Sequence, residues 1–449
     1  MTTRRDLLRG VLGLGGLAAF SGFAPRLTSA HAGEVRDDLY YVFCYFSGGW
    51  DLLLGLDPRD PRVFRDDLKK STRIQPGYGE LAKSDADLVR TSVPGMVFGP
   101  HIGGLARHAD KLAVVRGMSM DTLTHEVGRR RFLTGRPPAG LQAQGSSLAT
   151  LLAATLGRDE PIPQLSVRVE SYNDTQPSYA SAIRVTSVSD LLRALRPAPG
   201  ALSATERQAL EAVVEATRAC GEVRRSSVLT QAFDTRLAAQ DLVSLGLDGR
   251  FDLGAKTDEM EAVRSLYGID ARDLAAPGAQ AAAAVTALTS GIARCVSVEV
   301  AKDLDAHGPD WSGSHGQRCE AGFDVVASMI DDLASRPYKD TGDSWLDHTT
   351  IVGFSEFGRT PLLNSSGGRD HHLHNAAFLV GGGIRGGRVH GASSDLGMAP
   401  VRMDLASGHT DPGGEIIKPE HLCRAILQHA GITDDIGDLR VDPLTALYA

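Results

Sequence analysis

Four short and almost continuous apolar runs are the feature that most constrains how this chain folds. They comprise residues 39–46, 112–116, 349–354 and 377–380, and each is followed by glycine or a polar residue. Runs of this kind are typical of strands in a parallel sheet that is covered on both faces, because neither face of such a strand meets water. The chain is therefore predicted to have an α/β fold with a mostly parallel central sheet.

Helical patterns separate these runs. Ser203 and Glu206 have the spacing of a capping box ahead of an apolar periodic segment. A second pattern at helical spacing covers residues 323–333, and a third begins at Pro419. Strands that alternate with helices indicate a sheet with helices on both faces. The alanine-rich stretch from about 200 to 290 has no strand signal, so we expect it to form an inserted helical cap.

The N-terminus has the pattern of an export signal. The pair Arg4-Arg5 precedes an uncharged run at 11–24 that is rich in glycine, alanine and leucine. This run is shorter than the roughly 20 apolar residues of a membrane span, and a small-x-small cleavage pattern follows it. Paired arginines match the twin-arginine variant. We expect residues 1–32 to be removed and residues 33–449 to work in the periplasm or outside the cell, meeting the membrane only during export. An uncleaved membrane anchor is the alternative.

Charge and cysteine content exclude some classes of protein. The formal net charge of -8 argues against a nucleic-acid partner, which requires a basic face. The only dense basic run, Arg129 to Arg131, is too short to change this. The five cysteines show no CxxC spacing, so neither a zinc knuckle nor a thioredoxin motif is indicated. An odd number leaves at least one thiol free, and Cys44, inside the first apolar run, is expected to be buried.

Residues that can bind metal ions collect near the ends of the predicted strands. Three carboxylates and two imidazoles share this position: Asp51, Asp305, His307, Glu356 and His371. Ligands of open α/β sheets bind at the carboxyl ends of the strands, so we expect these side chains to converge. They suffice for one or two divalent ions, such as zinc, manganese, calcium or magnesium. Alternatively, Asp51 caps a helix and the histidines form a solvated loop.

The same polar motifs resemble those of a known family. They are Gly48-Gly49-Trp50-Asp51, Asp305-Ala306-His307, Ser355-Glu356-Phe357-Gly358-Arg359-Thr360, Asp370-His371 and the glycine-rich segment 381–387. Together with the leader they resemble the domain of unknown function 1501 family over nearly the whole mature chain. That family is similar to a branch of the alkaline phosphatase and sulfatase superfamily. The resemblance implies an alkaline phosphatase-like α/β domain.

The resemblance also implies roles for individual residues. Members of that superfamily hold metal ions with aspartates and histidines at strand ends. By this likeness one metal would be held by Asp51 and Glu356, and another by Asp305, His307 and His371. Asp370, which precedes His371, is a further candidate ligand.

The nucleophile position departs from the superfamily pattern. Residues 124–135 resemble the sulfatase nucleophile segment, which also ends in Leu-Thr-Gly. Counting back from that ending places His125 where a serine or cysteine would stand. Thr124 could serve instead if a metal activated its hydroxyl, or it could be only the N-cap of the next helix. Arg359 or an arginine of the basic run could clamp an anion, or form a surface ion pair.

These observations lead to two functional hypotheses. The first is an exported, metal-dependent hydrolase-like protein whose substrate is a small anionic phosphate or sulfate ester. The second is a non-catalytic cell-envelope protein that keeps the metal-binding fold to bind a ligand or an envelope component. The sequence has neither a Gly-x-Ser-x-Gly elbow nor a GxGxxG fingerprint, so serine hydrolases and dinucleotide-binding proteins are not indicated.

Overall fold

A computed structural model describes residues 35–196, 203–226, 242–243 and 245–448. The predicted export signal at 1–32 lies outside the described residues. Within the described parts of the chain, no helix is both long enough and apolar enough to cross a membrane.

The centre of the fold is an eight-stranded sheet with the strand order β12-β4-β11-β8-β1-β7-β5-β6. Its strands are β1 (Tyr40–Phe46), β4 (Leu112–Ser119), β5 (Gln164–Val167), β6 (Ile183–Val185), β7 (Cys295–Ala301), β8 (Thr349–Phe354), β11 (His374–Val380) and β12 (Arg388–His390). All neighbouring strands are parallel except β11, which is antiparallel to β4 and β8. The predicted α/β fold with a mostly parallel sheet is confirmed, and all four apolar runs lie in its strands.

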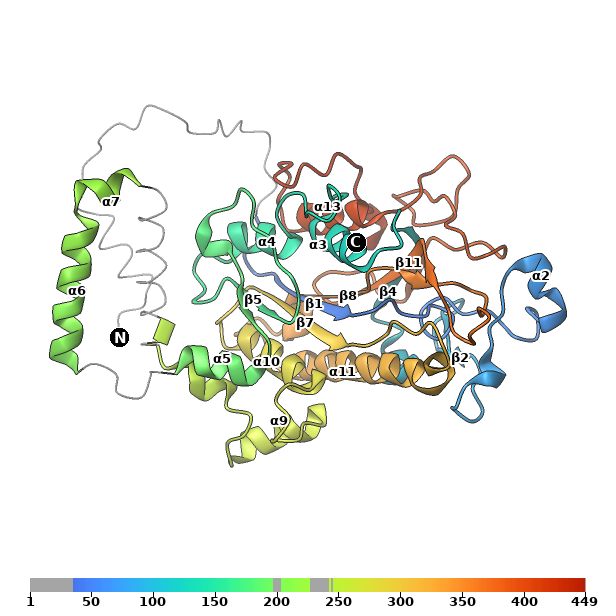
Figure 1. Cartoon of the computed structure of the whole chain (residues 1–449), viewed down its shortest axis with the longest axis horizontal. Coiled ribbons are helices and arrows are strands. Elements are labelled where there is room, and N and C mark those ends of the chain that lie inside the picture. The colour runs from blue at the N-terminus through green and yellow to red at the C-terminus, as the bar shows by residue number, and fades with distance from the viewer. Residues whose placement is uncertain (1–34, 197–202, 227–241, 244, 449) are drawn as a thin grey trace.

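Helices cover both faces of this sheet (Figure 1). One layer contains α5 (Val188–Leu195), α10 (Pro277–Thr289) and α11 (Gly316–Ser335), with α9 (Asp258–Tyr267) packed against α10 and α11. The other layer contains α3 (His125–Thr134), α4 (Leu148–Leu156) and α13 (Pro419–His429). The structure also contains the 15-residue α6 (Ala204–Arg218) and the short helices α2 (Lys69–Thr72), α7 (Gly221–Arg225) and α12 (Trp345–His348). Two pairs of short strands are β2 (Val89–Arg90) with β3 (Val97–Phe98) and β9 (Gly358–Arg359) with β10 (His371–His372).

Side chains of β1 alternate between two hydrophobic cores. Val42 and Cys44 belong to the core that includes α10 and α11. Tyr41 and Phe43 belong to the core that includes α3, α4 and α13. Both faces of β1 are buried, which explains why its sequence is apolar throughout instead of alternating. All five cysteines of the chain are free thiols, and only Cys220 is exposed.

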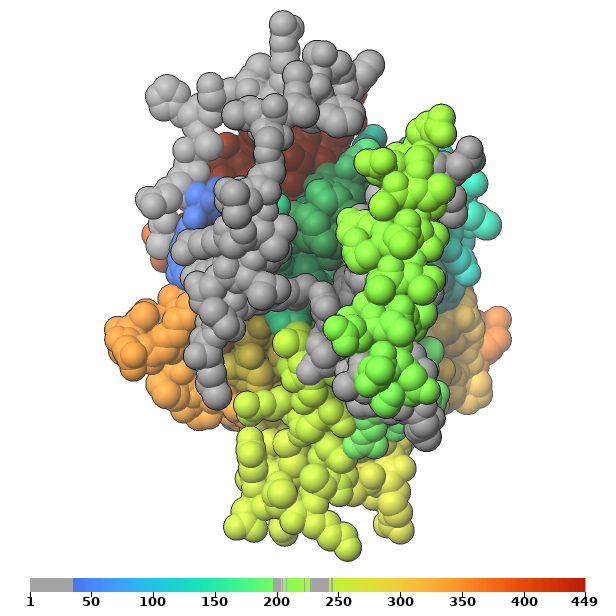
Figure 2. Space-filling model, turned by 90° about the vertical axis from the view of Figure 1, so that its left-hand side faces the viewer, coloured from blue at the N-terminus to red at the C-terminus, as the bar shows by residue number. Residues whose placement is uncertain are grey.

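The stretch predicted to form a helical cap, about 200 to 290, contains no strand in its described part. Its α6 begins with the expected capping box of Ser203 and Glu206. Figure 1 shows α6 and α7 standing apart from the sheet, and Figure 2 shows α6 from that side as an upright column. In contrast, α10 is largely buried and packs on β7, so it belongs to a helix layer of the sheet.

The direction of β11 determines which segments meet at one edge of the sheet. The carboxyl ends of β1, β7 and β8 lie at the same edge because these strands are parallel. Since β11 runs antiparallel to β8, its first residues lie at that edge as well. The loops after three parallel strands and the segment before β11 are therefore brought together.

Candidate metal centre

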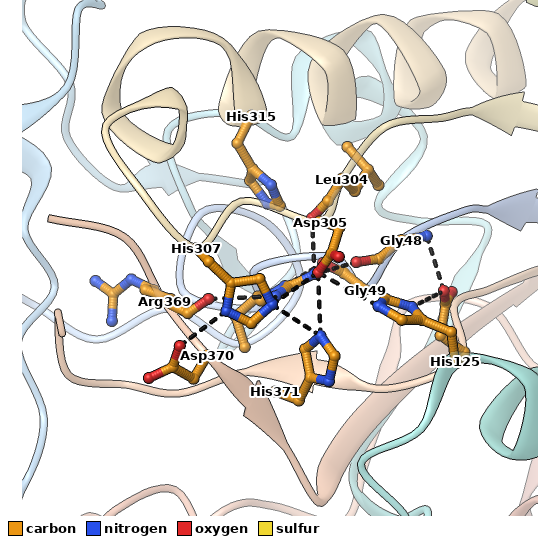
Figure 3. Close-up of polar contacts among 12 residues, drawn as sticks. Gly48, Gly49, His125, Leu304, Asp305, His307, His315, Arg369, Asp370 and His371 are labelled. Atoms are coloured by element: carbon orange, nitrogen blue, oxygen red, sulfur yellow. Dashed lines mark hydrogen bonds and ion pairs between the residues drawn. The ribbon is translucent and has the colours of Figure 1, made fainter. Parts of the chain in front are cut away.

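Four residues gather at this edge of the sheet. Asp305 and His307 follow β7, His371 lies in β10 just before β11, and His125 is the first residue of α3. Figure 3 shows the three imidazoles grouped around Asp305. The structure thus unites three of the sequence-predicted ligands, and it adds His125 from the predicted nucleophile position. These four residues are called the histidine cluster below.

One carboxylate oxygen lies at the centre of the histidine cluster. Oδ1 of Asp305 is 3.0 Å from Nε2 of His307, 3.0 Å from Nε2 of His371 and 3.3 Å from Nε2 of His125. The Nε2 atoms of His307 and His371 are themselves 3.0 Å apart. The potential ligand atoms of His125, Asp305 and His371 all lie within 4.8 Å of one another. Three imidazoles therefore direct the same nitrogen at a single point.

The other nitrogen of each imidazole is bound to an oxygen acceptor. Nδ1 lies 2.8 Å from Oε1 of Glu356 in His125, 2.8 Å from Oδ1 of Asp370 in His307, and 2.7 Å from the carbonyl oxygen of Leu123 in His371. A neutral imidazole that donates from Nδ1 keeps its lone pair on Nε2. Each of the three Nε2 atoms can therefore act as a metal ligand.

The donor set fits one divalent ion. Three imidazole nitrogens and a carboxylate oxygen are ligands that zinc and related metals use in proteins. In a tetrahedral zinc site, bonds of about 2.0–2.1 Å place neighbouring ligand atoms about 3.3–3.4 Å apart. The separations of 3.0–3.3 Å between Asp305 and each imidazole are close to that value. His125, Asp305 and His371 form the set whose ligand atoms all lie within 4.8 Å of one another, and His307 lies beside that set, 3.0 Å from Asp305 and from His371. Moreover, metal-binding histidines usually donate their second N–H to a carboxylate or carbonyl, as all three do here.

Charges around the histidine cluster also favour a cation. The carboxylates of Asp305, Glu356 and Asp370 lie on or next to its imidazoles, whereas Arg359 is the one guanidinium that contacts it among the described residues. Lone pairs and carboxylate oxygens at such short range repel one another unless a cation or a proton lies between them. Three carboxylates against one guanidinium leave room for a divalent charge.

The pKa values of the titratable groups reflect these contacts. Burial lowers the pKa of His125, but the hydrogen bond to Glu356 and the charges of Glu356 and Asp305 outweigh it and raise the pKa. Burial raises the pKa of Asp305, yet the hydrogen bond from Arg359, the contact with His371 and the charge of Arg359 hold it well below its ordinary value. Asp305 is therefore ionised at neutral pH.

Glu356 orients His125 instead of facing the centre of the cluster. Its side chain is buried, and both oxygens are occupied within the protein. Oε1 accepts from the backbone N–H of Gly48 at 2.9 Å and contacts His125, while Oε2 accepts from Tyr45 and Ser355, each at 3.0 Å. The sequence predicted Glu356 as a direct ligand. In the structure Glu356 instead accepts from Nδ1 of His125, as Asp370 does from Nδ1 of His307.

Asp51 lies in a buried ion pair away from the histidine cluster. Its Oδ2 is 2.9 Å from Nε of Arg369 and accepts from Nε1 of Trp311 at 2.7 Å. Its Oδ1 accepts from the backbone N–H of Leu53. The carboxylate expected to hold a second metal therefore neutralises a buried guanidinium, and among the described residues the one group that could hold a metal ion is that of His125, Asp305 and His371.

Arg359 has a structural role in place of the exposed anion clamp expected from the sequence. Its guanidinium is fully buried and donates to the carbonyl oxygens of Gly49 at 2.9 Å, Leu304 at 3.0 Å, Arg369 at 3.2 Å and Gly48. These bonds join the loops after β1 and β7 to the segment before β10. The N–H groups of Arg359 thus bond to carbonyl oxygens inside the protein. Without this guanidinium, those buried carbonyl groups would lack a hydrogen-bond donor.

The glycine pair after β1 allows this close approach. Gly48 has φ +112 and Gly49 has φ +84, which are left-handed conformations that favour glycine. A Cβ atom on Gly48 would lie 2.6 Å from the backbone nitrogen of Leu304. A side chain at this position would therefore separate the loops after β1 and β7.

Thr124 and the basic run occupy positions around α3. Thr124 is the exposed N-cap residue of this helix, but its side chain makes no capping hydrogen bond. Arg129 pairs with Glu170 at 3.0 Å, and Arg131 pairs with Glu420 at 2.6 Å. These arginines form ion pairs in the helix layer, whereas Thr124 directly precedes His125 at the start of α3.

The role of His125 could have been found from one local signal. Gly128 lies one helical turn after His125, and a Cβ atom there would be 2.4 Å from the carbonyl oxygen of Glu356. The glycine lets α3 pack against the end of β8, which brings His125 within reach of Glu356 and Asp305. A histidine at a helix start with a glycine three residues later indicates close packing of the helix on a strand only when that strand, here β8, is already known.

Comparisons with known proteins place the chain in a family. A family model described as a protein of unknown function, DUF1501, matches residues 41–407. The structure of Ps i-CgsB in complex with k-i-k-neocarrahexaose is 9% identical, with 90% of this chain and 74% of that chain covered and a TM-score of 0.37. The structure of BT4656 in complex with its substrate D-glucosamine-2-N,6-O-disulfate is 10% identical, with 90% and 79% covered and a TM-score of 0.31. Both likenesses are distant. No curated protein matches the sequence.

Proposed function

The chain belongs to the DUF1501 family of unknown function, and we propose that its histidine cluster binds one divalent metal ion and hydrolyses a small anionic ester. The observation that carries the proposal is the convergence of three Nε2 atoms on Oδ1 of Asp305, at 3.0 to 3.3 Å. Acceptors hold the opposite nitrogen of every imidazole, so this arrangement presents lone pairs where a cation is needed.

The residues around the histidine cluster have separate roles in such a site. Arg359 keeps Asp305 ionised and fixes it from the interior, and Glu356 sets the orientation of His125. His307 and Asp305 are about half exposed, so a substrate can reach the centre from solvent. A bound ion would polarise the ester and lower the pKa of a bound water, as divalent ions do in hydrolases.

Water is the nucleophile that this arrangement favours. Position 125 holds an imidazole that belongs to the ligand set, so no hydroxyl or thiol stands at the nucleophile position itself. Asp370 is exposed, and its Oδ2 accepts no hydrogen bond from a described residue. This oxygen can orient an attacking water. Phosphate and sulfate esters are the proposed substrate classes, since a cationic centre stabilises the charge on their oxygens.

Metal content of the native protein tests the proposal. The protein is purified from its own compartment without chelators, and bound metals are measured by mass spectrometry for the wild type, His125→Ala and His371→Ala. We expect about one divalent ion per wild-type chain and a large loss in both variants. His409→Ala is the matched control, because His409 is an exposed histidine outside the cluster. Absence of stoichiometric metal from the wild type, with a melting temperature unchanged by chelators, excludes the metal centre.

Hydrolysis is tested separately with chromogenic phosphate and sulfate esters in the presence of zinc, manganese, magnesium or calcium. Turnover that disappears in His371→Ala but survives in His409→Ala supports the hydrolase. Stoichiometric metal without turnover of any ester supports the second function, a non-catalytic envelope protein that binds a ligand at the metal. The observation in favour of that alternative is His125, which replaces the superfamily nucleophile.

Export is part of the same proposal. The paired arginines and the cleavage pattern of residues 1–32 support transport by the twin-arginine route into the periplasm or beyond. A metal centre assembled from segments after β4, β7 and β8 requires a folded chain, which is the form that this route carries.

A further inference from the structure

A cavity of about 510 Å³ lies beside the histidine cluster. Its lining includes Arg73, Thr360, Asn364, Asp370, His372 and Leu396. Asp370 links it to the cluster, because Oδ1 of this residue contacts Nδ1 of His307 at 2.8 Å. The volume falls within the range of about 300–1,000 Å³ that is typical of small-molecule sites. A ligand bound at the cluster can therefore extend into this cavity.

Arg73 brings a positive charge to this cavity, whose lining also includes the carboxylate of Asp370. It is exposed, and no described residue forms an ion pair or a hydrogen bond with its guanidinium. The buried arginines nearby differ, since Arg359 is paired with Asp305 and Arg369 with Asp51. An arginine without a carboxylate partner in a concave site is suited to an oxyanion, which it binds through two parallel N–H donors.

The backbone of Arg73 is held in an uncommon conformation. The residue caps α2 with φ 57 and ψ 30, and its N–H donates to the carbonyl oxygen of Lys69 at 2.9 Å. The left-handed region is unfavourable for a residue other than glycine. Glycine at this position would avoid that cost, so the arginine side chain is present despite an unfavourable backbone.

His372 adds a neutral donor to the same cavity. Its Nδ1 accepts from the backbone N–H of His374 at 3.2 Å. The hydrogen of the neutral imidazole is therefore on Nε2, for which no described residue is an acceptor. Arg73 and His372 together offer N–H donors, while Leu396 and Leu363 line the cavity with apolar surface.

We propose that this cavity is a second anion subsite, in which Arg73 and His372 bind an oxyanion of the substrate that is not the one hydrolysed. The inference rests on the proposed function, and it narrows the substrate to esters with at least two anionic groups, such as two sulfates, two phosphates, or one of these with a carboxylate. The leucines contact the scaffold that carries both groups. One group lies at the histidine cluster, and the other pairs with Arg73.

Non-hydrolysable anions test the subsite without any need for turnover. Benzene-1,3-disulfonate and naphthalene-1,5-disulfonate carry two sulfonates at different spacings, and benzenesulfonate carries one. Calorimetric titration of each compound into the native protein gives its dissociation constant. The ratio of the constants for benzenesulfonate and a disulfonate is the preference for a second anionic group. We expect at least one disulfonate to bind about tenfold more tightly than benzenesulfonate, since a charge-assisted pair contributes at least this much. The matching phosphonates form a second arm that distinguishes phosphate-like from sulfate-like ligands.

Substitution of Arg73 assigns that preference to the cavity. Arg73→Gln should abolish it, Arg73→Lys should retain part of it, and Arg65→Gln should leave it intact, because Arg65 is exposed and lies outside the cavity lining. The subsite is overturned if no disulfonate is preferred, or if Arg73→Gln keeps the full preference. If Arg73→Gln abolishes the preference for a disulfonate but the protein hydrolyses no ester, the second anion subsite is supported and only the hydrolase activity is rejected. If the protein hydrolyses esters but binds no disulfonate more tightly than benzenesulfonate, only the second anion subsite is rejected.

Discussion

Nη2 of Arg359 donates to Oδ1 of Asp305 at 2.6 Å, although the arginine is fully buried and the Asp305 side chain is 48% exposed. The central carboxylate of the histidine cluster is thus fixed from inside the protein while its outer side faces solvent. Rigid support from the interior and access from outside are both needed at a site that binds a ligand repeatedly.

Replacement of Arg359 by lysine tests this support. Arg359→Lys keeps the charge but loses the planar set of donors that reaches several carbonyl groups. We expect the free energy of unfolding to fall by about 3 kcal/mol, since the variant leaves buried polar groups without partners, and metal affinity to fall with it. Urea denaturation and metal titration measure both. Arg318→Lys is the control, because Arg318 is an exposed residue of α11 whose guanidinium donates to the Asp303 carbonyl in the loop after β7. Equal stability of the two variants would contradict the assigned role.

Glu356→Gln tests the orientation of His125. The amide is similar in size but removes the carboxylate that accepts from Nδ1 of His125. Loss of such a partner typically lowers metal affinity 10- to 100-fold. Competition with a fluorescent chelator measures the affinity, and Glu415→Gln, at an exposed carboxylate, should leave it unchanged. An affinity within twofold of the wild type in Glu356→Gln would show that His125 needs no such partner.

Thr124→Ala distinguishes the two candidate nucleophiles. If water attacks the ester, the variant should keep most of its turnover and all of its metal, because the Thr124 side chain makes no capping hydrogen bond. Complete loss of turnover with metal still bound would instead identify the Thr124 hydroxyl as the nucleophile. Steady-state hydrolysis and metal content, measured on the same preparation, decide between these outcomes.

The lowered pKa of His390 predicts that the folded protein loses stability in mild acid. This residue ends β12 and is buried, and its pKa is lowered to about 4 by burial and by the nearby charges of Arg388, His409 and Arg385. An unfolded histidine has a pKa near 6.5. Because the folded value is depressed, the stabilisation is complete above pH 6.5 and is lost as the pH falls toward 4.

The contribution of His390 to this loss of stability is the difference between the wild type and His390→Gln in how the free energy of unfolding changes with pH. One histidine shifted by this much contributes roughly 2–3 kcal/mol. We expect the free energy of unfolding to fall less between pH 7 and pH 4.5 in His390→Gln than in the wild type. Urea denaturation at several pH values gives both slopes, and the comparison is independent of any constant cost of the substitution. Identical slopes would mean that His390 is not held neutral.

The export signal is tested by conservative substitution. Changing both Arg4 and Arg5 to lysine keeps the charge but removes the pair that the receptor reads. Precursor should accumulate in the cytoplasm, as detected by fractionation and immunoblotting. Normal export of the double variant would exclude the twin-arginine route.

The sheet could be predicted because burial on both faces leaves a clear sequence pattern. Residues 40–46 are apolar at every position, and in the structure alternate side chains enter different cores. The direction of β11 could not be predicted, since a buried antiparallel strand is as apolar as a parallel one. That direction is what places His371 at the edge where Asp305 lies.

The candidate site was predictable in part, for a related reason. Asp305 and His371 follow from the rule that ligands gather at strand ends. Asp51 obeys the same rule, but its carboxylate pairs with Arg369, more than 300 positions away in the sequence. Glu356 also lies at a strand end, yet donors around it occupy both of its oxygens. Sequence position predicted which residues would be near the edge, whereas side-chain partners decided which of them face the centre.

The place of β1 in the sheet has a consequence for synthesis of the protein. Both of its neighbours, β7 and β8, begin about 250 residues or more after β1 ends. At a translation rate of about 5–20 residues per second, the ribosome needs roughly 10 to 50 seconds to make the nearer partner. During this interval an apolar strand with two unpaired edges is available for wrong pairing. Residues 40–46 of the nascent chain therefore stay exposed to wrong pairing until the strands on either side of β1 have been synthesised.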